Sequence, residues 1–197
     1  MRKKSIICCL LSKTRYYLLW HKYKFDRWHA SAPWPCRPYK EQVVKLASSI
    51  SMETVVEIGC GLGDIISHIT AKERYGLDID ERVIRAAKKL YPVGIDFDVA
   101  SLFNSNKIKN KCSNIDLLIM VNWPHNVNIN DICNAIDNLK SEIKLTYIII
   151  DEIKQGIVGY KYNHTPGNLC LIGKIIDSVE SFDGVRNLHL IKIQNDI

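Results

Sequence analysis

The stretch VVEIGCGLGD, residues 55–64, places three glycines directly after a short apolar run and between two acids. Glycine clusters that follow a strand let a ligand lie against bare backbone, and dinucleotides are the best-known ligands there. A dinucleotide fold has the pattern G-x-G-x-x-G, whereas here Gly59, Gly61 and Gly63 are followed at once by an acid. That acid, together with Glu57 at the strand end, would repel a pyrophosphate and favours a ligand that carries a cation.

Strands and helices alternate along the chain after residue 53, which is typical of a parallel sheet with helices on both faces. The pattern predicts strands at residues 54–58, 74–77, 94–99, 115–121 and 145–150. It predicts helices at residues 40–49, near 64–72, at 81–90 and near 130–143. Two β-rich runs, residues 169–181 and 185–194, then flank Phe182-Asp183-Gly184, which is a hairpin signal. We therefore expect an α/β fold with a mostly parallel sheet of seven strands that ends in an antiparallel hairpin.

The 197 residues fit one domain, and a composition of 47% hydrophobic and 24% charged residues excludes disordered and collagen-like chains. The charge is unevenly placed. Residues 1–40 hold ten lysines and arginines against Asp26 alone, so their net charge is +9. Because the whole chain has a net charge of +6, the remaining residues have a net charge of −3. We expect residues 1–40 to form a basic N-terminal arm or lid, and residues 41–197 to form the single domain.

The arm contains one clear helical pattern. Tyr16, Leu19, Trp20 and Tyr23 fall on one helix face. Such a basic, aromatic helix could rest on a membrane surface, or the arm could meet a nucleic acid or a phosphorylated substrate. It could also be a solvated, lysine-rich end. We expect it to pack as a lid on its own domain.

The seven cysteines are odd in number and form no C-x-x-C pair, so neither a zinc site nor a disulfide framework is indicated. The apolar run Ile6–Leu11 is too short for a signal peptide, and no stretch approaches the roughly 18 apolar residues of a spanning helix. We expect a cytoplasmic protein, with peripheral membrane contact through the arm left open.

A second motif follows the glycine stretch. The next strand ends Gly76-Leu77-Asp78, where an acid accepts hydrogen bonds from ribose hydroxyls. The acid with G-x-G-x-G and this second motif resemble the class I methyltransferases that depend on S-adenosyl-L-methionine (SAM), a Rossmann-like family. The resemblance covers residues 54 to about 152, and the closing hairpin is the usual end of that family. It implies SAM as cofactor and S-adenosyl-L-homocysteine as product.

The resemblance also implies a set of cofactor-binding residues. They are Glu57, Gly59, Cys60, Gly61, Gly63, Asp78, Ile79, Ser101, Leu102 and Asn122. Ser101 stands where the family often has an acid that receives the adenine amino group, and Asp98 is an alternative acid nearby. At the expected adenine contact, this sequence therefore differs from the family.

The family places acceptor-facing residues after its fourth strand. Here that segment partly resembles the Asn-Pro-Pro-aromatic motif of amine and amide N-methyltransferases, because Asn122 and Pro124 match while Trp123 and His125 do not. His125 is the candidate general base, with a histidine that only hydrogen-bonds the loop as the equal alternative. His164, on the loop after the fifth strand, is the second candidate.

The expected function is methyl transfer from SAM to a small-molecule or glycan-precursor acceptor, with O-methylation ahead of N-methylation. One alternative is an N-methyltransferase that acts on RNA or protein, which the basic arm favours. Another is a SAM-binding sensor or structural subunit without activity, which Ser101 keeps open. Asp151 and Glu152 lack matching acids in the sequence, so we expect no metal.

Overall fold

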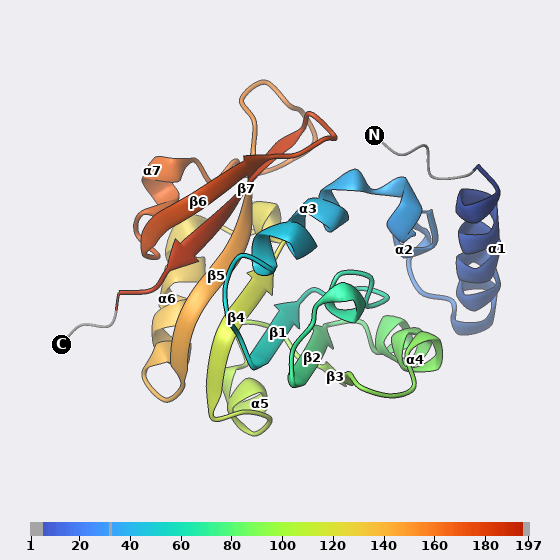
Figure 1. Cartoon of the computed structure of the whole chain (residues 1–197), viewed down its shortest axis with the longest axis horizontal. Helices are drawn as coiled ribbons and strands as arrows, with labels where there is room; N and C mark the ends of the chain where they lie inside the picture. Colours follow the sequence, from blue (N-terminus) through green and yellow to red (C-terminus); the bar gives the residue numbers. More distant parts are fainter. Residues whose placement is uncertain (1–5, 32, 195–197) are drawn as a thin grey trace.

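The computed structural model describes residues 6–31 and 33–194, with the backbone alone for residues 6–8. Arg2, Lys3, Lys4 and Ala32 of the basic arm lie outside the described residues. Seven strands form one sheet (Figure 1): β1 Thr54–Ile58, β2 Glu73–Asp78, β3 Asp96–Val99, β4 Asn114–Met120, β5 Lys144–Ile153, β6 Lys174–Glu180 and β7 Arg186–Lys192.

The strand order is β3-β2-β1-β4-β5-β7-β6. Strands β1 to β5 are parallel, whereas β7 is antiparallel to both β5 and β6. The predicted fold, mostly parallel with a C-terminal antiparallel hairpin, is therefore confirmed. The carboxyl ends of β1, β2, β4 and β5 meet at one edge of the sheet, and β7 begins at the same edge because it runs in the opposite direction.

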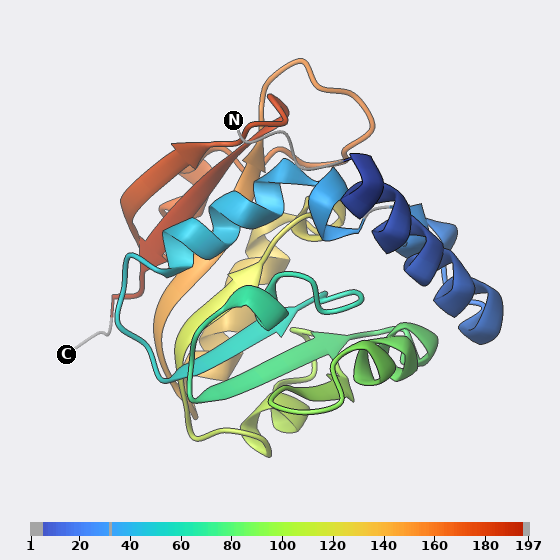
Figure 2. The same ribbon diagram turned by 45° about the vertical axis from the view of Figure 1, so that its right-hand side comes forward.

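Helices cover both faces of the sheet (Figures 1 and 2). They are α1 Ile6–Tyr23, α2 Arg27–Ser31, α3 Pro38–Ala47, α4 Glu81–Leu90, α5 Ser105–Lys109, α6 Ile129–Lys140 and α7 Pro166–Leu169, with short 3₁₀ turns η1 Trp34–Cys36, η2 Ile66–His68 and η3 Pro124–Asn126. Helices α5, α6 and α7 share one apolar core with the sheet, and α3 and α4 share the core on the other face. Strands β1, β4, β5 and β7 supply residues to both cores, as the two-residue period of a strand allows.

Helices α4 and α6 begin at polar caps. The side chain of Asp80 accepts a hydrogen bond from the backbone N–H of Arg82 at 2.8 Å, ahead of α4. Asn128 accepts one from the N–H of Asp131 at 3.0 Å, ahead of α6. Each cap satisfies a backbone donor that the first helical turn leaves free, which fixes where the helix begins.

Helix α1 adds a further layer outside α4 (Figure 2). Tyr16 of α1 and Phe25 pack with Val83, Ala86 and Leu90 of α4. Helix α4 is therefore apolar on two sides, one toward the sheet and one toward the arm. In the part of the chain that the structure describes, no helix is long and apolar enough to cross a membrane.

The helix predicted near residues 64–72 is wrong, because this segment contains only turns and η2. The N–H of Ile66 donates to the carboxylate of Glu57 at 2.9 Å instead of to a carbonyl one helical turn back. A histidine ring nitrogen competes for a backbone carbonyl as well, since Nδ1 of His68 lies 2.7 Å from the carbonyl oxygen of Asp64. The short helices α5 and α7 were not predicted, and residues 170–173, expected to begin the hairpin, form a turn after α7.

Candidate cofactor and acceptor site

The glycine turn follows β1 at the carboxyl edge of the sheet. Gly59 and Gly61 have φ angles of 71° and 55°, a left-handed backbone that residues with a side chain rarely adopt. Packing excludes a side chain too: a Cβ on Gly59 would lie 2.3 Å from Cδ1 of Trp123, and one on Gly61 would lie 3.0 Å from Cδ2 of His29. The turn therefore requires glycine, and rings from the arm and from the loop after β4 line it.

Asp78 lies at the tip of β2 beside this turn. Its Oδ2 accepts a hydrogen bond from the N–H of Gly61 at 2.9 Å, and its Oδ1 accepts one from the N–H of Asp80 at 3.0 Å. Each carboxylate oxygen keeps a further lone pair for a ligand. The next residue, Ile79, is 76% exposed and adds an apolar surface to the same edge. The arrangement suits a ribose, as predicted for Asp78, and that role stays a prediction.

Two more acids are buried around the turn. Burial raises the pKa of Glu57 to about 8, against the opposing influence of the Ile66 N–H and of Lys40. Asp64 accepts hydrogen bonds from the phenol of Tyr16 and from Nζ of Lys40, the latter at 2.5 Å. Burial, reinforced by Asp64, raises the pKa of Tyr16 far above its usual range, so the phenol remains a donor. The surroundings of the turn are acidic, and one acid resists ionisation.

The N-terminal arm covers the turn. His29 of α2 lies over Gly61, and its Nδ1 is buried without a hydrogen-bond partner. Trp34 of η1 stacks on His68 with ring centroids 3.8 Å apart. An orphaned buried nitrogen is rare, because it costs the full desolvation of a polar group. The arm therefore lays the His29 ring over the glycine turn, with Cδ2 and Nε2 nearest to Gly61.

These groups fit SAM better than a dinucleotide. The acids Glu57 and Asp64 match a ligand with an ammonium and a sulfonium, and Asp78 matches its ribose. A pyrophosphate would instead meet the carboxylate of Asp64 and a second acid, Glu57. It would also lack the helix N-terminus that normally receives it, because the segment after the turn is not a helix.

Cys60 is in the turn, but its thiol faces inward. It is 5% exposed, and its Sγ donates weakly to the carbonyl oxygen of Gly61 at 3.5 Å. Burial raises the pKa of the Cys60 thiol well above its usual value. Its backbone N–H donates to the carbonyl oxygen of Leu77 at 3.0 Å and so joins the turn to β2. Any contact of Cys60 with a ligand is therefore through the backbone.

The segment after β3 contains the predicted adenine contacts. Leu102 is 1% exposed and packs in the core beneath α6, whereas Phe103, which was not predicted, is 55% exposed. Ser101 is half-buried. The alternative acid, Asp98, pairs with Lys111 at 3.1 Å. This ion pair competes with any contact between Asp98 and an adenine amino group. A pocket of about 270 Å³ opens beside these residues, lined in part by Phe103, Val127, Asp131, Asn134 and Asn138.

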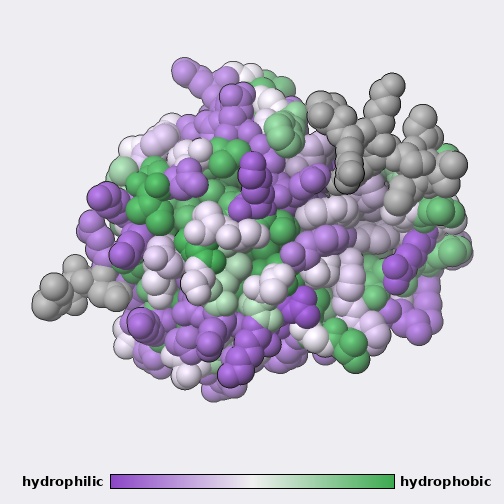
Figure 3. All heavy atoms as spheres, viewed as in Figure 1, coloured by the Kyte–Doolittle hydropathy of each residue, from purple (hydrophilic) through white to green (hydrophobic). Residues whose placement is uncertain are grey.

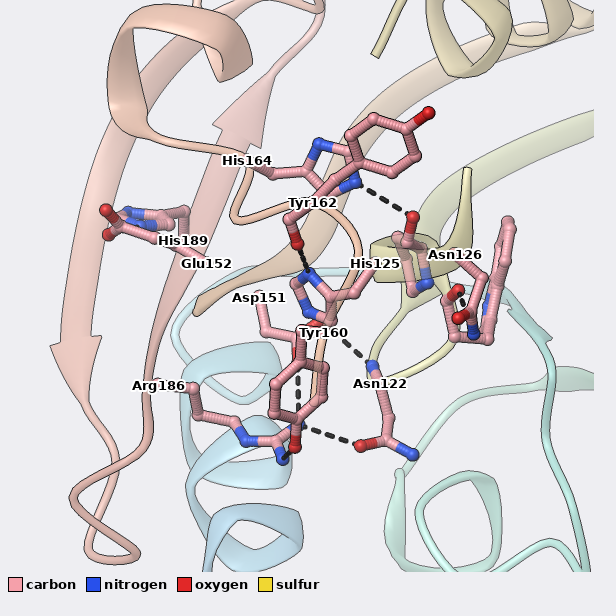
Figure 4. A network of polar contacts seen from close by, with 12 residues as sticks. Asn122, His125, Asn126, Asp151, Glu152, Tyr160, Tyr162, His164, Arg186 and His189 are labelled. Carbon is pink, nitrogen blue, oxygen red and sulfur yellow. Dashed lines mark hydrogen bonds and ion pairs between the residues drawn. The ribbon is translucent and has the colours of Figure 1, made fainter. Parts of the chain in front are cut away.

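The two candidate bases lie in the loops after β4 and β5 (Figure 4). His125 is 0% exposed: its Nδ1 lies 3.0 Å from the carbonyl oxygen of Tyr162, and its Nε2 lies 3.0 Å from Oδ1 of Asp151, out of line for a hydrogen bond. Nε2 of His164 lies 2.8 Å from the carbonyl oxygen of Pro124. Burial lowers the pKa of His164. Both nitrogens of His125 face oxygen acceptors, so this geometry favours a histidine that joins the two loops.

Arg186, at the start of β7, joins the same network. Its guanidinium, 2% exposed, pairs with Asp151 at 2.6 Å and with Asp183 at 3.0 Å, and donates to Oδ1 of Asn122 at 3.1 Å (Figure 4). It also lies 4.3 Å from the ring centroid of Tyr39. Burial alone would raise the pKa of Asp151, but His125, Arg186 and the N–H of Asn122 outweigh it, and the pKa lies below its usual value.

The predicted site residues thus fall into two groups along one edge. We call the ends of β1, β2 and β3 the donor half, and the ends of β4 and β5 with the start of β7 the acceptor half. Asn122, predicted to contact the cofactor, belongs to the acceptor half: its φ is 80°, and its N–H donates to Asp151 at 2.9 Å. Sequence reasoning missed Arg186. The acid Asp151 in a buried strand was the signal that a buried cation must lie opposite.

Comparisons with known proteins agree with the observed fold. The chain aligns with the N-methyltransferase NodS of Bradyrhizobium japonicum WM9 in complex with S-adenosyl-L-homocysteine, with a TM-score of 0.67, 16% identity and coverage of 92% of this chain and 99% of that one. It aligns with the magnesium protoporphyrin IX methyltransferase ChlM of Synechocystis PCC 6803, also with bound S-adenosyl-L-homocysteine, with a TM-score of 0.63, 13% identity and coverage of 90% and 94%. The chain therefore has the Rossmann-like fold of the class I SAM-dependent methyltransferases.

A sequence relative is more limited. Protein 235L of Invertebrate iridescent virus 6, which carries a provisional methyltransferase name, is 38% identical over 60 residues. The match covers 28% of this chain and 22% of that protein. No family model matches the chain.

Proposed function

We propose that the chain is a methyltransferase that uses SAM and acts on a small-molecule or glycan-precursor acceptor. The observation that carries the proposal is the acidic glycine turn, with Glu57 and Asp64 beside it and Asp78 hydrogen-bonded to it. When bound, SAM supplies a methyl group on a sulfonium. The acids would hold its cationic end, and Asp78 would accept the ribose hydroxyls.

The arm would close the donor half. His29 lies over Gly61, and Tyr16 is hydrogen-bonded to Asp64, so the arm already contacts the turn. Excluding water and holding the reactants in line are the main contributions that a protein makes to such a displacement. This supports the lid role that we predicted for residues 1–40.

The preferred acceptor is one from which the protein does not have to remove a proton. The ring nitrogens of His125 face a carbonyl and a carboxylate, and Nε2 of His164 faces a carbonyl. A neutral amine attacks without prior deprotonation, and an ionised carboxylate or acidic hydroxyl does so too, whereas an alcohol requires a base. This supports an amine nitrogen or an ionised oxygen of the small molecule as the methyl acceptor in place of an alcohol, whereas the sequence favoured O-methylation over N-methylation.

Calorimetric titration tests the cofactor. SAM and S-adenosyl-L-homocysteine should bind, while nicotinamide dinucleotides should not, because the turn presents acids and no helix N-terminus. A dinucleotide that binds as tightly as SAM would overturn the proposal. Binding of SAM without turnover on any acceptor would favour the sensor alternative.

A turnover assay that detects S-adenosyl-L-homocysteine tests the acceptor class, with small amines, carboxylates, alcohols and RNA as acceptors. His125→Gln in the same assay separates the two roles of this residue. A general base contributes typically about 10²–10⁴-fold in rate, so a loss of that size confined to alcohols would restore His125 as the base. We expect an equal, smaller change for all acceptors, together with lower thermal stability, because the contact between the loops weakens.

A further inference from the structure

Helix α1 is apolar on two opposite sides, and the residues that the structure describes cover only one of them. Tyr16 is buried on the domain side, and Leu19 and Trp20 are half-buried with it. On the outward side, Leu10, Leu11, Tyr17 and Leu18 are 59%, 67%, 52% and 64% exposed. Residues seven and eight apart lie on the same helix face, so these four form one surface, which we call the outward face.

The place of α1 in the molecule leaves this face open. In Figures 1 and 2 the helix stands at the end of the molecule, outside α4 and next to α2. Hydrophobic residues lie beside strongly hydrophilic ones over this end in Figure 3. A contiguous apolar surface on a helix at the edge of a protein marks an interaction site more often than isolated apolar residues do.

Basic residues of α1 border the outward face. Lys13, Arg15 and Lys22 are exposed and flank it by the helical period, and Lys24 and Arg27, beyond the helix, are exposed too. The residues of α1 include no acid, and the carboxylate of Asp26, just beyond it, accepts a hydrogen bond from the N–H of Trp28 at 2.5 Å. Leucines in the centre with lysines and arginines at the edges are the pattern of helices that lie in the interface of a lipid bilayer.

The combination of exposed leucines and bordering cations distinguishes between the partners that could cover the outward face. A second copy of the chain would bring the same cations against these, which opposes self-association. A nucleic acid would use the cations but would leave the leucines in water, because the phosphate backbone dominates its binding. An anionic bilayer satisfies both, since its headgroups attract the cations and its acyl boundary accepts the leucines.

We propose that the outward face of α1 docks on a lipid bilayer that contains anionic lipid. The domain side of the helix stays on α4, so docking requires no unfolding of the arm. The methyltransferase domain would then lie at the membrane surface without a spanning segment. This inference is independent of the acceptor and of methyl transfer.

Cosedimentation of the full chain with vesicles tests the proposal, using phosphatidylcholine alone and phosphatidylcholine mixed with phosphatidylserine. The wild type should sediment with the mixed vesicles, and less so as salt increases. Leu11→Ser with Leu18→Ser should abolish this binding. Lys13→Ala and Lys22→Ala should each weaken it by about fivefold. The matched control is Val158→Ser with Phe182→Ser, which changes two apolar residues that are 88% and 72% exposed elsewhere.

Retained circular dichroism and SAM binding show that each variant is folded. Equal sedimentation of the leucine variant and the wild type would overturn the proposal. So would binding to RNA but not to vesicles, or a dimer in solution that the leucine variant dissociates, because each assigns the face to a different occupant.

Discussion

Two buried carboxylates at the same edge of the sheet have opposite pKa shifts. Glu57, on β1, is 4% exposed, and burial raises its pKa to about 8. Asp151, on β5, is 0% exposed, yet its pKa is lowered because its contacts outweigh burial. The protein therefore neutralises the acid of the acceptor half with its own Arg186. It leaves Glu57, the acid of the donor half, without a paired arginine, and a site for a cationic ligand requires such an acid.

The largest effect should come from breaking the balance of the acceptor half. Arg186→Met removes the cation that pairs with Asp151 and Asp183 and leaves a buried carboxylate unpaired. Breaking a buried ion pair in this way costs about 3–5 kcal/mol, so the free energy of unfolding in urea should fall by that amount.

The double variant Arg186→Met with Asp151→Asn is the control. It removes the stranded charge as well, so it should be more stable than Arg186→Met alone. If the single variant loses less than about 1 kcal/mol, the network is not a source of stability and the comparison with Glu57 fails.

The donor half should instead respond to pH. Glu57 has a raised pKa in the folded state, so its contribution to stability is fully present below its unfolded value of 4.5 and is lost as pH rises through about 8. Within that window the wild type should lose about 1.4 kcal/mol per pH unit relative to Glu57→Gln, which does not titrate. Urea unfolding of both proteins between pH 5 and pH 8 measures the difference.

SAM sharpens this test, because a cation beside Glu57 favours its ionised form. Binding near pH 7 should release about one proton, seen as a binding enthalpy that depends on the ionisation enthalpy of the buffer. Glu57→Gln should remove that dependence. Parallel pH profiles for wild type and Glu57→Gln would show that the acid ionises normally.

The smallest of the three effects concerns a single contact in the donor half. Asp78→Ala should weaken SAM by about 1.5–3 kcal/mol, the range for hydrogen bonds to a charged group, in a calorimetric titration. Asp98→Ala is the matched control, because Asp98 lies on the neighbouring strand β3 but pairs with Lys111. Equal effects of the two substitutions would mean that Asp78 has no special contact.

Local patterns were enough to predict the sheet, α4, α6 and the helix that carries Tyr16, because apolar period and caps are properties of the nearby sequence. The helix predicted after the glycine turn was wrong because a contact distant in the sequence decides the structure there. The backbone N–H of Ile66 is taken by Glu57, nine residues away, and no local pattern records that.

The candidate site divides in the same way. Glu57, Gly61 and Asp78 could be proposed from the sequence because the glycine turn and the strand tip come from adjacent parts of the chain. Arg186 was missed since its partners Asp151 and Asn122 are 35 and 64 residues distant and meet only in the folded sheet. The burial of both histidines was equally invisible, because it depends on how two loops pack.

The position of β7 between β5 and β6 has a consequence for synthesis. Residues 186–192 are made after β6, yet they separate β6 from the rest of the sheet. Until they leave the ribosome, β6 has no strand partner, β5 has an open edge, and Asp151 lacks its guanidinium. The parallel half can fold during translation, whereas the acceptor half closes only after the last strand is inserted. A chaperone that shields open strand edges would act in that interval.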